Sequence, residues 1–372
     1  MTQPAPRAGQ PTELAEAATP ASASPRPQPA TDGPRPQPAT DGRRTQPATD
    51  GRRTGAGVPG WLRAVAGKVL RLILSIAAVL TLTFLMVQLI PGDPVRLALG
   101  PDASASLVAA KRQQLGLDQS LLSQYFTYWG HMLTGKLGNS LVTQEPVSLV
   151  VKSGFADTAI IVGLSLGAIA VISILGGLLV GIATHRGRRP WLRSAFTLST
   201  AISSAVPDFL LAVGLVFVFA VTFKIFPVAG ASSASAFVLP TAAITLGSAA
   251  IMMRVVRSAT DTVLDQDYVA VARARGLSPL RVYLHHALPN MLTAALTLGG
   301  LQVGTVVTGT IVVENVFAIP GLGSQLVTAL TSHDYPVVQG IMVILATAIL
   351  VINLLIDVAL GLLDPRSVRQ KG

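Results

Sequence analysis

Few residues in this sequence could do chemistry, and their spacing excludes most kinds of catalytic site. The stretch GHMLTGKL at 130–137 has the Gly-x-x-x-x-Gly-Lys spacing of a phosphate-binding loop, but Leu137 stands where a Ser or Thr hydroxyl would bind Mg²⁺. His285 and His286 are adjacent, so on a helix their side chains point about 100° apart and cannot share a metal ion. Cysteine is absent, which removes thiolate ligands and thiol nucleophiles. We therefore expect no catalytic residue, no cofactor and no metal site.

Carboxylates within apolar segments are the remaining candidates for a functional role. Asp208 follows Pro207, Asp357 lies near the end of the last apolar segment, and Glu314 lies at the end of another. An ionisable group in a hydrocarbon environment is a functional candidate by default. Asp208 could instead satisfy backbone groups freed by a kink at Pro207. Glu314 could steer a cationic group or order a gate, or it could pack against the turn that follows.

A basic stretch, DYVAVARARGLSPLRVYLHHALPN at 267–290, carries the clearest local signals. Asp267 is a candidate cap for a first helix, and Gly276 is a candidate left-handed terminus for it. Ser278 can cap again, and Pro279 suits the first position of a second helix. The sequence thus predicts two short helices that meet at a glycine hinge.

The composition places these residues in a membrane protein. Of the 372 residues, 50% are hydrophobic and 12% are charged, and the mean hydropathy of +0.57 is outside the range of an ordinary soluble domain. Six apolar segments are near or above the roughly 20 residues that cross a bilayer. They cover residues 72–90, 158–184, 194–223, 237–253, 291–313 and 336–363. We therefore expect an all-α membrane protein with six transmembrane helices. Gly-x-x-x-Gly spacings at 177–181 and 300–304 favour close packing between them.

The basic residues indicate the orientation of these helices, because Lys and Arg gather on the cytoplasmic side of a membrane. If both termini are cytoplasmic, 22 of the 28 Lys and Arg residues fall on that side. The net charge of +10 and the pI near 10.5 then reflect membrane topology, and we expect no nucleic-acid partner. The 267–290 segment would face the cytoplasm.

The chain divides into four expected regions. Residues 1–58 contain three copies of QPATDG in a tract rich in Pro, Ala and Arg, which has almost nothing to bury, so we expect a disordered cytoplasmic tail. The first transmembrane helix is expected within 59–92, followed by an extracytoplasmic region at 93–157. The main transmembrane domain is expected at 158–366, with a cytoplasmic loop at 258–289.

On physical grounds alone, the 267–290 segment has more than one interpretation. Its second helix would carry an apolar stripe opposite Arg281 and His285. The stripe consists of Leu280, Tyr283, Leu284 and Ala287. Such a helix could float in lipid headgroups, lie on the helical bundle or enter a groove on a partner. A DNA-binding helix-turn-helix has similar spacing, but spans at both ends hold the segment against the bilayer, where a major groove could hardly fit.

The same stretch resembles the EAA loop of ABC importer permeases. In that loop Glu-Ala-Ala is followed after three residues by Gly, and after nine more by Ile-x-Leu-Pro. The matching positions here are Ala272, Gly276 and Leu288-Pro289. Ala270 and His286 stand at the Glu and Ile positions, but DYV, ARARGLS and HALPN are similar to the variant in the dipeptide, oligopeptide and nickel permeases.

The resemblance to the B-type subunit of those permeases extends over about residues 60–366. It rests on four further stretches: PGDP at 91–94, LGLDQSLLSQY at 115–125, ENVFAIPGLGSQLVTALTSHDYPVVQG at 314–340 and NLLIDVALGLLDPR at 353–366. One departure is Lys136 in GKLGNS, where the resemblance leads us to expect Asp. The resemblance implies the six-helix fold of a type I ABC importer permease.

This resemblance also implies a permease subunit that performs no chemistry itself. The subunit would sit in the lipid of a bacterial cell membrane and pair with an unlike, paralogous permease subunit as a heterodimer. Two cytoplasmic ABC ATPase subunits and an extracytoplasmic solute-binding protein would complete the importer, with the binding protein docking on the extracytoplasmic region. Dipeptides or oligopeptides are the implied cargo, and glutathione and nickel chelates are the alternatives.

By the same resemblance, the 267–290 segment is the coupling helix that docks on an ATPase subunit. The expected contact residues are Ala270, Ala272, Arg273, Arg275, Gly276, Leu277, Ser278 and Arg281. Asp208 and Glu314 become candidate pore or gate residues. Two other classes of protein fit less well. A secondary transporter would show inverted repeats, and an intramembrane enzyme would need a nucleophile and a base at matching depth.

Overall fold

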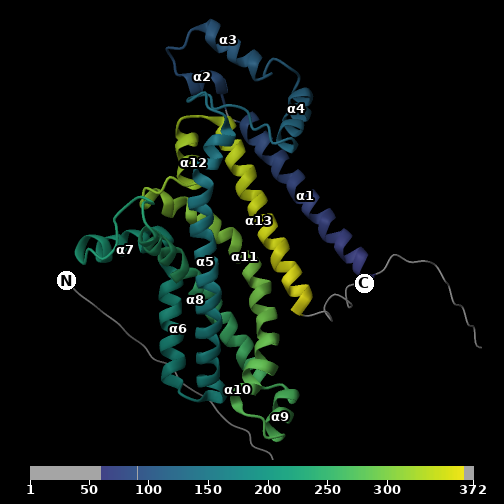
Figure 1. The fold of residues 1–372 in the computed structure, drawn as a ribbon, viewed down its shortest axis with the longest axis vertical. Coiled ribbons are helices and arrows are strands. Elements are labelled where there is room, and N and C mark those ends of the chain that lie inside the picture. The colour runs from purple at the N-terminus through teal and green to yellow at the C-terminus, as the bar shows by residue number, and fades with distance from the viewer. Residues whose placement is uncertain (1–59, 90, 364–372) are drawn as a thin grey trace, which may run out of the picture. The chain divides into compact units, whose positions relative to one another are not determined.

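The structure is a computed structural model that describes residues 60–89 and 91–363 (Figure 1). Within those residues the chain forms helices and turns, and its strand-like pairing is limited to one isolated bridge between Asn139 and Pro146. The expected all-α class is thereby confirmed. The tail expected at 1–58 lies outside the described residues.

Among the described residues, five helices are long and apolar enough to cross a membrane, and a bent helix pair makes a sixth candidate span. The five are α1 (Gly60–Gln88), α5 (Val147–Thr184), α8 (Val238–Leu264), α11 (Leu288–Val316) and α13 (Tyr335–Leu363), and the pair is α6 (Pro190–Ala205) with α7 (Asp208–Leu215). Each of the six expected segments overlaps one of these candidate spans over most of its length. The second span begins at Val147, well before the expected start at residue 158.

The pair α6 and α7 is bent by 95° at Val206 and Pro207. Val206 has an extended backbone (φ −80°, ψ 122°), because the proline ring clashes with a helical conformation of the residue before it. Beyond α7 the chain continues as the π-helical η2 (Val216–Thr222). The third span is therefore not one straight helix, and the break puts Asp208 in the first turn of α7.

Short helices lie at the two ends of the bundle (Figure 1). At one end lie α2 (Pro94–Leu99), α3 (Ala105–Gln114), α4 (Leu121–Leu133) and α12 (Leu322–Thr331). At the other end lie α9 (Asp267–Ala274) and α10 (Pro279–Arg281), which passes into the π-helical η4 (Val282–Ala287). The single-turn element η1 (His185–Gly187) follows α5, and another, η3 (Ala234–Phe237), precedes α8.

Small residues bring α5 and α8 close together. A Cβ built at Gly177 would lie 2.6 Å from the Cβ of Val256, and one at Gly181 would lie 2.6 Å from the Cβ of Thr260. Such distances leave no room for a side chain, so the close packing predicted at 177–181 is confirmed. At Gly304 a Cβ would meet nothing within 4 Å, so the second Gly-x-x-x-Gly pair makes no such contact there.

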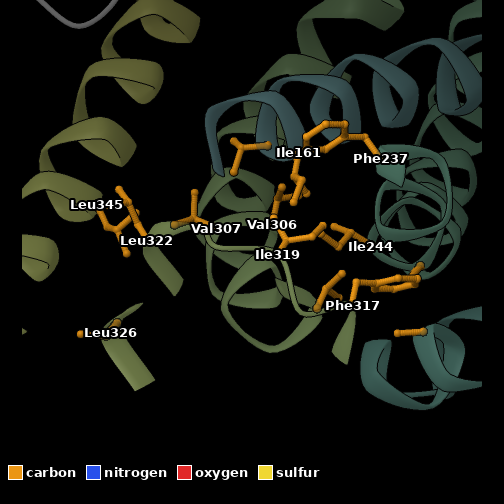
Figure 2. Packing of buried hydrophobic residues seen from close by; sticks show 14 of the residues in the cluster. Ile161, Phe237, Ile244, Val306, Val307, Phe317, Ile319, Leu322, Leu326 and Leu345 are labelled. Carbon is orange, nitrogen blue, oxygen red and sulfur yellow. The ribbon is translucent and has the colours of Figure 1, made fainter. Parts of the chain in front are cut away.

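Buried apolar side chains fill the space between α5, α8 and α11. Figure 2 shows Ile161 from α5 and Ile244 from α8 close to Val306 from α11. Phe317 and Ile319, from the turn after α11, join the same core. The turn that leads into α12 is thus packed against the spans.

Candidate functional site

The first helix of the 267–290 segment forms as α9, but its start differs from the prediction. The N-cap residue is Gln266, and it makes no side-chain capping bond. Asp267 lies inside the first turn of α9. The prediction that Asp267 caps this helix is therefore wrong. Its carboxylate still lies where negative charge stabilises a helix, because the N-terminus carries a partial positive charge.

Gly276 ends α9 as predicted. Its φ is +73°, in the left-handed region that disfavours residues with a Cβ. The Gly276 N–H donates to the carbonyl of Arg273 at 3.0 Å, and the Leu277 N–H donates to the carbonyl of Ala272 at 3.4 Å. These two bonds form a Schellman motif. The predicted hinge is thus an ordered turn in which the N–H groups of Gly276 and Leu277 are both hydrogen-bonded.

The second predicted helix is not a separate element. Ser278 is the N-cap residue and Pro279 the first helical residue, as predicted, although the Ser278 side chain makes no capping bond. After one turn the chain enters η4 and then α11 without a break. Pro289 has no N–H, so the α-helical bond to the carbonyl of His285 cannot form there. The second half of the segment thus continues directly into α11, whose residues Ala295–Val316 form the fifth candidate span.

The π-helical turn changes which side chains are buried. Val282, Ala287 and Met291 are each at most 1% exposed, whereas Leu280 is 67% exposed and Leu284 is 43% exposed. A π-helix closes its hydrogen bonds over five residues instead of four, so its turn is wider and the buried positions are spaced differently from those of an α-helix. The predicted stripe of Leu280, Tyr283, Leu284 and Ala287 is wrong for this reason, and only its last member is fully buried.

The segment is anchored to three spans through a small apolar core. Its buried members are Leu178 of α5, Val263 and Leu264 of α8, Val269 and Ala272 of α9, Val282 and Ala287 of η4, and Met291 of α11. A hydrogen bond of 2.7 Å from Asn290 Nδ2 to the hydroxyl of Tyr268 also joins α11 to α9. A force on α9 would therefore reach α5, α8 and α11 together.

The residues expected to contact a partner divide into two groups. Six are exposed: Ala270, Arg273, Arg275, Gly276, Ser278 and Arg281. Ala272 is 6% exposed and Leu277 is half-buried, and both belong to the small apolar core. Within residues 60–89 and 91–363, the three arginines form no ion pair. Their charges are thus available on the outer surface of the segment.

Sequence reasoning missed a polar cluster beside this segment. The buried His185 lies with Nδ1 3.6 Å from Asp261 and Nε2 3.5 Å from Asp265. Arg257 donates to the other oxygen of Asp261 at 3.1 Å. The cluster ties the end of α5 to the end of α8, just before α9 begins. The available signal was the spacing of Asp261 and Asp265, which puts both on one helix face.

Asp208 lines a cavity of about 490 Å³ between α7 and α11. The other lining residues are Phe209, Gly304, Thr305, Thr308, Gly309 and Val312. A Cβ at Gly309 would lie 2.9 Å from Asp208 Oδ2, so the carboxylate lies directly against α11. Among the described residues nothing donates a hydrogen bond to this carboxylate. The structure therefore does not use Asp208 to satisfy backbone groups at the kink.

Glu314 lies near the C-terminal end of α11 and is fully buried. Its carboxylate accepts hydrogen bonds from the N–H groups of Gly323 at 2.7 Å and Ser324 at 3.1 Å, and from the hydroxyl of Thr158 at 2.5 Å. Thr158 in turn accepts from the N–H of Leu322 at 2.8 Å. An anion at the N-terminus of a helix is stabilising, so this carboxylate fixes α12 against α11 and α5. Thr158 was not among the residues singled out from the sequence.

A bundle of apolar helices with a basic, anchored loop at one end and a cavity between its spans has the architecture of a membrane permease. A family model described as "Binding-protein-dependent transport system inner membrane component" matches residues 173–369, and the model of the corresponding N-terminal region matches residues 61–160. The chain belongs to this family.

Relatives support the same assignment over most of the chain. The glutathione transport system permease protein GsiC of Salmonella paratyphi A is 39% identical over 306 residues, which is 82% of this chain and 98% of that protein. GsiC of Escherichia coli K12 is 36% identical over 305 residues, with the same coverage. The chain is thus an ABC importer permease of the peptide and nickel family, and a multi-pass inner-membrane protein. It is not an enzyme, since ATP hydrolysis belongs to partner subunits.

Two solved structures are also similar to the chain. An amino acid ABC transporter with histidines aligns with a TM-score of 0.42 and 17% identity, covering 59% of this chain and 94% of that one. The MetNI methionine ABC transporter in an inward-facing conformation aligns with a TM-score of 0.45 and 20% identity, covering 61% of this chain and 98% of that one.

Proposed function

We propose that this permease forms half of the pore of an ATP-driven importer of peptides, as a heterodimer with an unlike permease subunit. The observation that carries the proposal is the match to glutathione permeases over 98% of their length. Glutathione is a tripeptide, so cargo of that size and chemistry is the first choice, and dipeptides and oligopeptides follow. Two ATPase subunits and an extracytoplasmic solute-binding protein complete the transporter.

The orientation follows from the basic residues. Both termini and the 267–290 segment face the cytoplasm, because Lys and Arg gather on that side of a bacterial membrane. The end of the bundle that carries α2, α3, α4 and α12 then faces outward. The outer segments between 93 and 157 receive the loaded solute-binding protein.

The 267–290 segment couples this chain to an ATPase subunit through its exposed surface. Arg273, Arg275 and Arg281 supply free positive charge, and Ala270 lets a partner approach α9 closely. Ala272 and Leu277 act from the inner side, because they anchor the segment to the spans. Movement of an ATPase subunit is thereby passed to α5, α8 and α11, which also pack around the core of the bundle.

Asp208 and Glu314 serve transport in different ways. Asp208 lies in the translocation path, where its carboxylate in the α7–α11 cavity attracts the cationic ends of peptides. Glu314 acts as a gate residue by holding α12 in place at the outer end of the bundle, since its carboxylate is buried and already bonded.

Uptake into proteoliposomes tests this function. The vesicles contain this chain with its unlike permease partner and ATPase subunits, and the solute-binding protein is added outside with labelled glutathione, a dipeptide, an oligopeptide or a nickel chelate. We expect uptake of peptide that requires ATP inside the vesicles and stops without the ATPase subunits. Uptake of the nickel chelate alone would refute the peptide assignment, and uptake without ATP would refute the importer.

A further inference from the structure

Helix α4 has two distinct faces and contains no Asp, Glu, Lys or Arg residue. At about 100° per residue, its apolar and aromatic side chains fall on one continuous arc. They are Leu121, Leu122, Tyr125, Phe126, Tyr128, Trp129, Met132 and Leu133. Ser123, Thr127 and His131 fall on the opposite arc. The helix is thus strongly amphipathic, although it lies in the stretch expected to be extracytoplasmic.

One part of the apolar arc is fixed against the outer third of α1. Tyr125 and Tyr128 pack their rings on Phe84, with centroid distances of 5.3 Å and 5.7 Å. The Tyr125 hydroxyl is 2.8 Å from the Thr81 hydroxyl. Thr81 lies seven residues before Gln88, where the first span ends, which corresponds to about 10 Å along the helix. Next to Tyr125, Gln124 accepts a hydrogen bond of 3.1 Å from Gln88, the last residue of the span, so α4 lies along the outer end of the first span.

The rest of the apolar arc has no partner within the described parts of the chain. Leu122 is 72% exposed, and Phe126 and Leu133 are each 69% exposed. Beside α4, the first span also directs apolar side chains outward, with Leu82 at 66% and Leu85 at 45% exposed. Two neighbouring helices thus both expose apolar side chains at the outer end of the bundle.

We propose that α4 is an interfacial helix, with Leu122, Phe126 and Leu133 inserted among the lipids of the outer leaflet. An amphipathic helix of this kind buries its apolar face about 5–10 Å into the boundary between headgroups and acyl chains, which agrees with the contacts of α4 to Thr81 and Gln88 near the outer end of α1. Tyr and Trp are enriched at that boundary, and α4 has Trp129 beside the exposed face. The polar arc with Thr127 and His131 faces the protein and the water above the membrane.

This assignment restricts where the solute-binding protein can dock. Within the expected extracytoplasmic region, the apolar face of α4 is taken up by lipid, so docking is left to its polar face, α2, α3 and the turn before α5. It also explains why a helix with so many apolar residues can lie at the outer edge of the structure, since the membrane covers what the protein does not.

Spin labelling tests the proposal, because the chain contains no cysteine that would need to be removed. Phe126→Cys and Leu133→Cys carry a nitroxide on the apolar face, and Ser123→Cys and Thr127→Cys are matched controls on the polar face. The assembled transporter is placed in lipid nanodiscs, and only variants that retain ATP-dependent uptake are measured. Collision rates are recorded with oxygen, which partitions into lipid, and with a water-soluble nickel chelate.

The ratio of oxygen to nickel collisions should be several-fold higher at 126 and 133 than at 123 and 127. A ratio that is the same on both faces, with nickel dominant, would mean that α4 lies in water and would overturn the proposal. Protection of 126 and 133 from both reagents would also overturn it, because a partner protein would then cover the face instead of lipid. Two labelled positions on the apolar face keep the test decisive if one variant fails to assemble.

Discussion

Replacing Glu314 with Gln should loosen the start of α12, and the hydrogen bonds give the size of the effect. The carboxylate accepts from the N–H groups of Gly323 and Ser324 at 2.7 Å and 3.1 Å. A bond to a charged acceptor contributes about 1.5–3 kcal/mol and a neutral one about 0.5–1.5 kcal/mol. The amide oxygen of Gln can keep both bonds as neutral ones, so each loses about 1 kcal/mol. We therefore expect the N-terminus of α12 to lose about 2 kcal/mol of local stability.

Hydrogen–deuterium exchange at the amides of Gly323 and Ser324 measures this loss directly. A change of 2 kcal/mol corresponds to about 30-fold faster exchange, since about 1.4 kcal/mol is a factor of ten. Glu145→Gln is the matched control, because Glu145 is exposed and its side chain forms no hydrogen bond to the described residues. Unchanged exchange at Gly323 and Ser324 in Glu314→Gln would refute the assignment of Glu314 to this helix end.

Transport by the same variant separates two roles for Glu314. If the carboxylate only holds α12, uptake of cationic, neutral and anionic peptides should fall together. If it steers cargo, uptake of cationic peptides should fall selectively. A selective loss would contradict the role in holding α12, and unchanged uptake for every cargo would remove both roles in transport.

Three further variants test other parts of the account. Asp208→Asn should lower peptide uptake several-fold while the ATPase subunits stay bound, and normal uptake would remove Asp208 from the translocation path. Gly177→Ala should lower the thermal midpoint of the purified complex, because a Cβ there would lie 2.6 Å from Val256. The control is Gly163→Ala, where a Cβ would meet nothing within 4 Å, and it should leave the midpoint unchanged or raise it. The same change in the midpoint of both variants would contradict the close packing of α5 and α8. Burial raises the pKa of Tyr128 to about 12, so above pH 10 the folded state binds more protons than the unfolded state. The free energy of unfolding should therefore fall as the pH rises from 10 to 12. Tyr128→Phe should flatten that fall, and identical slopes would contradict the pKa shift.

Local sequence signals predicted the parts of the fold that depend on a few neighbouring residues. The N–H groups of Gly276 and Leu277 make the two backbone hydrogen bonds that end a helix at a left-handed glycine, so the helix end at Gly276 could be predicted from the sequence. The first helical position of Pro279 could be predicted in the same way, from the local preference of proline for that position. The membrane spans were also predictable, since length and hydropathy decide them.

Features that depend on distant residues were not predictable in the same way. The carboxylate of Glu314 is held by Thr158, which is 156 residues away in the chain. The spacing of buried residues in 280–291 depends on a π-helical turn, and an analysis based on 3.6 residues per turn cannot detect it. Proline at position 207 signalled a kink, but the cavity beside Asp208 is completed by residues of α11 such as Gly309, about a hundred residues further along the chain.

The comparison of Gly276→Arg with Gly135→Arg tests the central claim, that the 267–290 segment couples this chain to an ATPase subunit. Both glycines have positive φ, +73° and +72°, and at both a Cβ would meet nothing within 4 Å in this chain. Both also end a helix with the same pair of backbone bonds, so each variant costs about 1–2 kcal/mol of backbone strain. Any larger difference between them must come from a partner at the cytoplasmic end.

The measurement is co-purification of the ATPase subunits with the tagged permease, together with peptide uptake by the same preparation. We predict that Gly276→Arg reaches the membrane but abolishes uptake, and that the ATPase subunits are lost or their hydrolysis no longer responds to the loaded solute-binding protein. Gly135→Arg should keep the ATPase subunits bound. Normal uptake by Gly276→Arg with ATPase subunits bound would contradict the claim and leave the segment as a helix that only lies at the membrane surface.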